Sequence, residues 1–365
     1  MGHTGVKANV ILRLRTAGSA CVLFAILLGF SGGARAADNA VILLYHHVSG
    51  TTPASTSVSP AVFEQHFSYL AEGFNVISLE QVINQLAAGK PLPERAVAIT
   101  FDDGYGNIYE NAHPLLTRYG MPYTVFINPP LIGRQGYQLS WEQVAEMERG
   151  GARFANHTMQ HTHLLERKKD EKEAGWLSRI RQDILDAEVM LQERLGYSLR
   201  YIAYPYGEFD NELKTLVSDL GFVGFGQHSG AIFSGSDYRA LPRFAAAGSY
   251  AKLDSLKVKI NSLALPVTGV RGTSNSDGKG GEVTAGFTFT FDSGDLAVKQ
   301  LACYFRGRPL PVSVVYSTVS VSLPGVPPIG RSRVNCTGPS NAEVGRYYWY
   351  SYPWFTARAD GTYPD

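Results

Sequence analysis

One stretch constrains the fold more than any other: an apolar run that ends in two acids and a glycine, Ala96–Val97–Ala98–Ile99–Thr100–Phe101–Asp102–Asp103–Gly104–Tyr105. The apolar part follows the breaker Pro93, is short and is partly β-branched, so it predicts a buried strand. Two carboxylates at the mouth of such a strand are costly if they are buried unpaired, so a cation, a metal ion or hydrogen-bond donors must compensate them. An Asx turn closing the strand, for which Asp-Gly is typical, is the alternative.

Length and composition limit the class of protein. A chain of 365 residues allows about two domains. With 44% hydrophobic residues, 12% aromatic residues and a formal net charge of +1, the composition is that of a globular protein and argues against a nucleic-acid binder.

The N-terminal residues 1–37 have the pattern of a signal peptide. Basic residues precede the apolar run Ala17–Phe30, and Ala34–Arg35–Ala36 fits a small-x-small cleavage site. We therefore expect a periplasmic or secreted protein without a membrane span after cleavage. A retained anchor is the alternative, although the run is shorter than the roughly 20 residues of a spanning helix.

Three cysteines occur, and one of them, Cys21, lies in the apolar N-terminal run. Cys303 and Cys336 remain as an even pair in a chain expected to be exported, which predicts a disulfide. Two free thiols are the alternative.

Residues 38–265 alternate between strand-like runs and amphipathic helices. Such alternation implies a parallel sheet. Seven or eight strands in about 220 residues favour an α/β fold of the distorted (β/α) barrel type with about seven strands. An open doubly wound sheet is the alternative, but no Gly-x-Gly-x-x-Gly turn follows the first strand, Val41–Tyr45.

Residues 266–365 have a different pattern. Phe287, Phe289 and Phe291 alternate with threonines, which predicts a small all-β, sandwich-like accessory domain that contains both cysteines. The aromatic tail from Arg346 to Phe355 would pack on the barrel or bind sugar.

Two further polar clusters follow predicted strands. His157 and His161 are spaced to face one metal ion on a helical turn, although this spacing alone is weak evidence. Ala203–Tyr204–Pro205–Tyr206–Gly207 predicts a tight turn that could present a backbone N–H to a ligand oxygen. Taken together with Asp102 and Asp103, the clusters supply a carboxylate and two imidazoles for a catalytic metal with an open position, and a second carboxylate as base.

Thr100–Gly104, His157–His161 and Pro205–Gly207 resemble, in order and spacing, the first three motifs of the polysaccharide deacetylase (NodB-homology) family. The resemblance extends from Val41 to Arg243. It implies a distorted (β/α) barrel that removes N- or O-acetyl groups from polysaccharides with a divalent metal, often zinc.

The resemblance also implies roles for single residues. Asp103, His157 and His161 become the metal ligands, Asp102 becomes the general base, and the Tyr206 N–H helps to hold the oxyanion.

The sequence departs from the family pattern at two places. Ala203 stands where the family usually has the arginine that orients the base, and we hypothesise that Arg243 reaches the same carboxylate; a surface arginine is the alternative. The family's late histidine has no clean match, so His228 is a candidate for proton donation or substrate binding. Trp141 would form the wall of a sugar subsite or part of the core.

The sequence therefore predicts a metal-dependent hydrolase, acting on carbon–nitrogen bonds other than peptide bonds, that deacetylates an extracellular or cell-wall polysaccharide. O-acetyl ester hydrolysis is a second enzymatic possibility. A carbohydrate-binding protein that has lost turnover on the same barrel is the alternative from another class.

Overall fold

The structure is a computed structural model that describes residues 1–2, 38–134, 136–275, 284–292 and 294–364. The expected signal segment lies outside the described residues except for Met1 and Gly2, so it stays a prediction. Within the described part of the chain, we find no helix with the length and apolar character needed to span a membrane.

The largest sheet is built around β1 (Ala40–Tyr45) and β5 (Ala96–Phe101), which are parallel and buried along their whole length. The strand order is β10-β1-β5-β6-β7-β8-β9, with β11 beside β1 and β4 beside β5. Only β10 runs antiparallel to its neighbour among these pairs. The sheet confirms the predicted distorted barrel of about seven strands. The other strands are β4 (Asn75–Val76), β6 (Tyr123–Ile127), β7 (Ala152–Asn156), β8 (Tyr201–Ala203), β9 (Val223–Phe225), β10 (Ala231–Ile232) and β11 (Phe244–Ala245).

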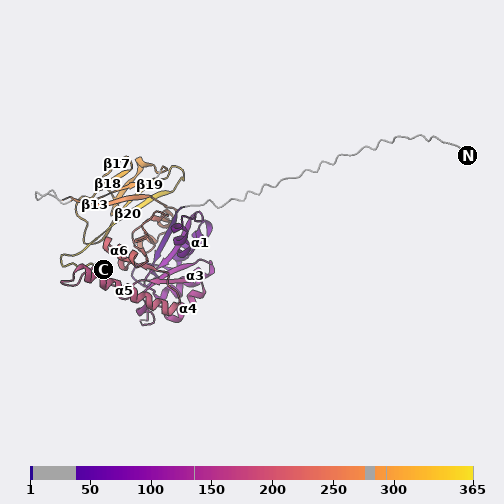
Figure 1. Ribbon diagram of the computed structural model, residues 1–365, viewed down its shortest axis with the longest axis horizontal. Coiled ribbons are helices and arrows are strands. Elements are labelled where there is room, and N and C mark those ends of the chain that lie inside the picture. The colour runs from indigo at the N-terminus through magenta and orange to yellow at the C-terminus, as the bar shows by residue number, and fades with distance from the viewer. Residues whose placement is uncertain (3–37, 135, 276–283, 293, 365) are drawn as a thin grey trace. The chain divides into compact units, whose positions relative to one another are not determined.

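Helices follow most of these strands, and α1, α3, α4 and α5 are labelled around the large sheet in Figure 1. The expected caps explain where several begin and end. Ser59 accepts a hydrogen bond from the Val62 N–H at the start of α1, Ser140 and Gln143 form a capping box for α4, and Gly196 ends α5. The helices are α1 (Pro60–Gly73), α2 (Leu79–Ala87), α3 (His113–Arg118), α4 (Trp141–Arg149), α5 (Glu173–Leu195), α6 (Asn211–Asp219) and α7 (Leu253–Ile260), with short turns η1 (Ile108–Ala112), η2 (Pro129–Leu131), η3 (Pro205–Gly207), η4 (Gly248–Ala251) and η5 (Val298–Gln300).

The C-terminal residues form two mainly antiparallel sheets, with strand orders β12-β20-β19-β15-β16 and β13-β14-β18-β17. A separate two-stranded pair is formed by β2 (His47–Val48) and β3 (Ser57–Val58). The C-terminal strands are β12 (Leu263–Ala264), β13 (Val267–Asn275), β14 (Thr284–Phe291), β15 (Ala302–Phe305), β16 (Arg308–Pro309), β17 (Val312–Val315), β18 (Thr318–Ser322), β19 (Gly330–Pro339) and β20 (Tyr347–Thr356).

The C-terminal sheets share one aromatic and aliphatic core. Phe287 and Phe289 are fully buried and contact Tyr350 of β20 at ring-centroid distances of 6.4 and 5.0 Å. Cys303 and Cys336 are direct partners on β15 and β19 and form the predicted disulfide. The all-β region is therefore confirmed.

The aromatic tail is strand β20, and part of it packs against the large sheet. Trp349 contacts Phe244, the first residue of β11, with ring centroids 5.1 Å apart. Residues 35–365 form one compact unit, so the domain boundary at residue 265 stays a prediction.

Candidate active site

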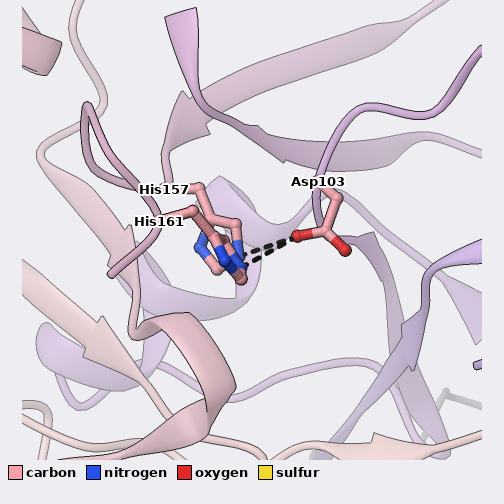
Figure 2. Close-up of side chains that lie close together, drawn as sticks. All are labelled: Asp103, His157 and His161. Carbon is pink, nitrogen blue, oxygen red and sulfur yellow. Dashed lines mark ion pairs between the residues drawn. The ribbon is translucent and has the colours of Figure 1, made fainter. Parts of the chain in front are cut away.

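Three side chains from two strand ends converge on one point, and we call them the triad. Asp103 follows β5, whereas His157 and His161 follow β7. Asp103 Oδ1 lies 3.2 Å from Nε2 of each histidine, and Figure 2 shows both rings turned toward this carboxylate. Within the described residues, it is the one group of three His, Cys, Asp or Glu side chains with ligand atoms this close, all within 4.8 Å.

The backbone around the triad adopts left-handed conformations that are rare for residues other than glycine. The φ angle is 72° at Asp103, 70° at Thr158 and 48° at His161. Gly104 follows with φ of 71°, and a Cβ there would lie 2.8 Å from a side chain of β6. Residues 157–163 form a loop without helix, so the predicted helical turn is wrong. Backbone strain of this kind concentrates at functional sites.

Buried hydrogen bonds hold the first histidine in one orientation. His157 is fully buried, and its Nδ1 lies 2.8 Å from the carbonyl oxygen of Ala203. Since only an N–H can donate to this carbonyl, the proton is on Nδ1 and the lone pair of Nε2 faces Asp103. The side-chain amide of Asn128 donates to the carbonyl oxygens of His157 and Thr158, which fixes the loop from below.

The triad fits a divalent cation. Asp103 Oδ1 and His157 Nε2 are buried acceptors without a hydrogen-bond partner. Burial raises the pKa of Asp103, but the two imidazoles outweigh this effect and the pKa lies well below its usual range. An ionised carboxylate facing two imidazole nitrogens is the ligand set of a zinc site with an open position, and a donating Nδ1–H on a ligating histidine is the usual supporting contact.

The other carboxylate of the strand end is paired with an arginine. Arg243 immediately precedes β11, and its two terminal nitrogens donate to the two oxygens of Asp102 at 2.7 and 2.8 Å. Both side chains are fully buried, and the Arg243 Nε donates to the carbonyl oxygen of Gly226. Burial raises the pKa of Asp102, while Arg243 and His157 lower it further, so the carboxyl stays ionised. The structure brings Arg243 to the carboxylate named in our hypothesis, although β8 carries Ala203.

Tyr206 lies at the centre of the turn η3. Its φ angle is 58°, and the following Gly207 has φ of 73°, where a Cβ would lie 2.8 Å from the Gln227 nitrogen. The ring of Tyr206 contacts His161 at 4.8 Å and stacks on His163 at 3.9 Å between centroids. The predicted tight turn therefore lies directly beside the triad.

A second ring of contacts supports this turn. Glu208 is fully buried, and its Oε2 lies 2.9 Å from Nδ1 of His163. Arg331 of β19 lies 3.6 Å from the Glu208 carboxylate and 5.2 Å from the Tyr206 ring centroid. A C-terminal strand thus contacts the loop that carries Tyr206.

Two sequence candidates lie elsewhere. His228 lines a cavity that none of the triad residues lines. Burial, followed by the charges of Arg333 and Lys214, lowers the pKa of His228 to about 3. Trp141 packs against the main core, with the guanidinium of Arg194 5.2 Å from its ring centroid.

The sequence analysis missed His46, His47 and Tyr105. The charge of His46 acts on both Asp102 and Asp103, and the His47 ring stacks on Tyr105 with centroids 3.6 Å apart. The signal was available, because His46 ends the strand that pairs with β5. The partners Tyr45 and Phe101 are in register, so the residues that follow them emerge at the same edge.

This fold and site define an α/β-barrel protein with a candidate metal centre at the carboxyl ends of its strands. Residues 89–225 match the family model described as polysaccharide deacetylase, and the chain belongs to that family. The resemblance seen in the sequence is therefore confirmed.

Curated relatives have the same family character. The chain is 28% identical over 207 residues to the poly-beta-1,6-N-acetyl-D-glucosamine N-deacetylase of Staphylococcus aureus (strain MRSA252), covering 55% of this chain and 71% of that protein. It is also 28% identical over 182 residues to YxkH of Bacillus subtilis (strain 168), which carries a polysaccharide deacetylase name. That match spans 50% of this chain and 61% of YxkH.

Solved structures agree with the fold. IcaB from Ammonifex degensii is 26% identical with a TM-score of 0.53, over 60% of this chain and 97% of that chain. The Streptococcus pyogenes deacetylase PplD in complex with acetate has a TM-score of 0.55 at 23% identity, over 61% of this chain and 98% of that chain.

Proposed function

We propose that this protein is a metal-dependent hydrolase that removes N-acetyl groups from a polysaccharide. One observation carries the proposal: unpaired ligand atoms of Asp103, His157 and His161 lie beside a second, ionised carboxylate, Asp102. Zinc is the expected ion for one carboxylate and two imidazoles. When bound, such an ion acidifies a water molecule and polarises the acetyl carbonyl.

Asp102 is the proposed general base. Its two oxygens are held by the Arg243 guanidinium, so the carboxylate has a fixed orientation and remains ionised. A bidentate arginine provides both charge and geometry, which a lysine would not. Arg243 is thus a positioning residue that takes over the role for which Ala203 is unsuited.

The Tyr206 N–H is the proposed donor to the acetyl oxygen as negative charge develops on it. The leaving amine also needs a proton. His46 is our candidate for the donor, because it is partly exposed and its charge acts on both carboxylates. His228, the donor suggested by the sequence, lines a different cavity and suits ligand binding better.

The proposed substrate is a polysaccharide of N-acetylated amino sugar, by analogy with the poly-beta-1,6-N-acetyl-D-glucosamine N-deacetylase to which the chain is similar. We further propose a periplasmic or secreted location. The Cys303–Cys336 disulfide supports an oxidising compartment, and the N-terminal sequence pattern supports export.

Acetate release tests the function. Purified protein is stripped with a chelator, reloaded with zinc, and incubated with poly-β-1,6-N-acetylglucosamine; we expect release only after reloading. Asp103→Asn should abolish release and metal uptake. A protein that binds zinc and glycan but releases no acetate would favour the carbohydrate-binding alternative. Release from an O-acetylated glycan alone would favour ester hydrolysis.

A further inference from the structure

A cavity of about 440 Å³ lies between loops that follow the strands of the large sheet and the C-terminal sheets. We call it the C-terminal cavity. The residues on its wall that matter here are Phe209, His228, Asp237, Tyr350, Tyr352 and Phe355. Its volume falls in the range of small-molecule binding sites, roughly 300–1,000 Å³.

The wall of the C-terminal cavity is aromatic on both sides. Phe209 follows the turn η3, Phe355 belongs to β20, and their rings lie 5.2 Å apart at 64°. Tyr352 stacks one ring face on Phe287 at 4.5 Å. Aromatic surfaces of this kind bind the apolar face of a ring-shaped polar ligand.

Polar atoms on the wall lack partners within the protein. His228 Nδ1 is buried without a hydrogen-bond partner. The hydroxyls of Tyr350 and Tyr352 make no hydrogen bond to any described residue, although the charge of Asp237 acts on Tyr350. Because buried polar groups are normally satisfied, several unused donors and acceptors on one wall indicate a bound polar molecule.

The charges beside the cavity are already compensated. Lys214 Nζ lies 3.0 Å from one oxygen of Asp237, and Arg239 donates to both oxygens of this carboxylate. Burial also keeps His228 neutral near pH 7, because it lowers the pKa of this imidazole to about 3. The geometry therefore favours a neutral ligand over an anion or a cation.

We propose that the C-terminal cavity binds one neutral pyranose ring of a glycan chain. The rings of Phe209 and Phe355 contact the apolar face of the sugar, and the two tyrosine hydroxyls and His228 bind its hydroxyl groups. The cavity adjoins the candidate active site through a short loop, since Phe209 is three residues after Tyr206. One chain can then occupy both sites, and this last step rests on the proposed function.

The probe is a hexamer of β-1,6-linked N-acetylglucosamine. Tyr350→Phe/Tyr352→Phe removes two oxygens, and Phe355→Ala removes an aromatic wall. Tyr304→Phe is the matched control, because Tyr304 on β15 does not line the cavity. Calorimetric titration in an Asp103→Asn background, where turnover is blocked, should show about tenfold weaker binding for both cavity variants and no change for the control.

Kinetics separate the cavity from the active site. With an intact triad, the cavity variants should raise KM for the hexamer about tenfold and leave turnover of a small acetyl ester unchanged. If the protein releases no acetate but the cavity variants still lose hexamer binding, the proposed function fails and the cavity proposal stands. Hexamer binding and KM that match those of the control would overturn the cavity proposal. If Phe355→Ala does not fold, the tyrosine pair decides.

Discussion

The carboxyl edge of the large sheet and the C-terminal sheets use polar groups in opposite ways. At the edge, the acceptors of Asp103 and His157 face each other without a hydrogen-bond partner. In the C-terminal sheets, β19 and β20 are paired residue by residue over their whole length, and a disulfide joins β15 to β19. Unpaired buried acceptors are costly, so the surroundings or a ligand must compensate them. The difference shows which region is built for chemistry and which for support.

The largest effect should come from exchanging one carboxylate for an amide in each region. Asp103→Asn should reduce acetate release by at least about 10³-fold, or about 4 kcal/mol, because a ligand charge is lost. The metal-free variant should be as stable as the parent or more stable, since the amide can donate to His157 Nε2. Acetate assays, metal analysis and urea unfolding test both parts.

Asp295→Asn is the control for this comparison. The Asp295 carboxylate accepts hydrogen bonds from the Ala342 N–H and the Ser340 and Tyr348 hydroxyls. The substitution should therefore lower the free energy of unfolding by about 1 kcal/mol and leave acetate release unchanged. If Asp103→Asn destabilised the metal-free protein as much as Asp295→Asn does, the contrast between the regions would be lost.

The next effect concerns the buried ion pair of the edge. Arg243→Met leaves the Asp102 carboxylate buried without its partner, which should cost about 3–5 kcal/mol of unfolding free energy as well as activity. Arg331→Met is the matched control, because its side chain is 37% exposed and belongs to β19. Equal stability of both variants in urea would show that the Arg243 pair is not what holds the base.

Much of this architecture could be predicted from sequence, because local patterns carry it. The buried run Ala96–Phe101, the caps at Ser59 and Ser140 and the alternating phenylalanines each form the expected element. The triad could be predicted too, since its motifs follow strands of one parallel sheet.

Other features depend on contacts that are distant in sequence. Arg243 is 141 residues from Asp102, and no local pattern reports that pair. His46 was missed although the register of β1 with β5 places it at the same edge. The loop after β7 was predicted as helical because a spacing of four suits a helix, whereas left-handed residues achieve the same convergence. Strained loops of this kind are set by their surroundings rather than by propensity.

The disulfide should have a smaller effect, confined to the C-terminal sheets. Replacing both Cys303 and Cys336 by alanine opens a link between positions 33 residues apart, which should cost about 2–4 kcal/mol. Hydrogen exchange should then speed up in β15 and β19, while turnover of a small acetyl ester stays within about twofold. A matching loss of protection in β1 and β5 would show that the two regions unfold as one and would remove the distinction between them.

The smallest effect should come from Lys259 of α7, which lies where the two regions meet. Its Nζ is 2.9 Å from the Ala245 carbonyl oxygen and 3.3 Å from that of Tyr250, so the two N–H groups of a neutral amine suffice here. Burial, with the charge of Arg333 on β19 adding to it, lowers the pKa of Lys259 to about 7, and His66 is another titratable group that interacts with it.

Between about pH 7 and the ordinary lysine pKa of about 10.4, the unfolded chain binds a proton at Lys259 that the folded chain does not. The free energy of unfolding should therefore rise with pH across this window, by about 1–2 kcal/mol relative to Lys259→Met, and the full cost of the buried charge is present below pH 7. Urea unfolding of both proteins at pH 6, 8 and 10 measures the difference. Parallel pH profiles would mean that Lys259 keeps its proton in the fold, and that the junction between the sheets tolerates a buried charge as the edge does.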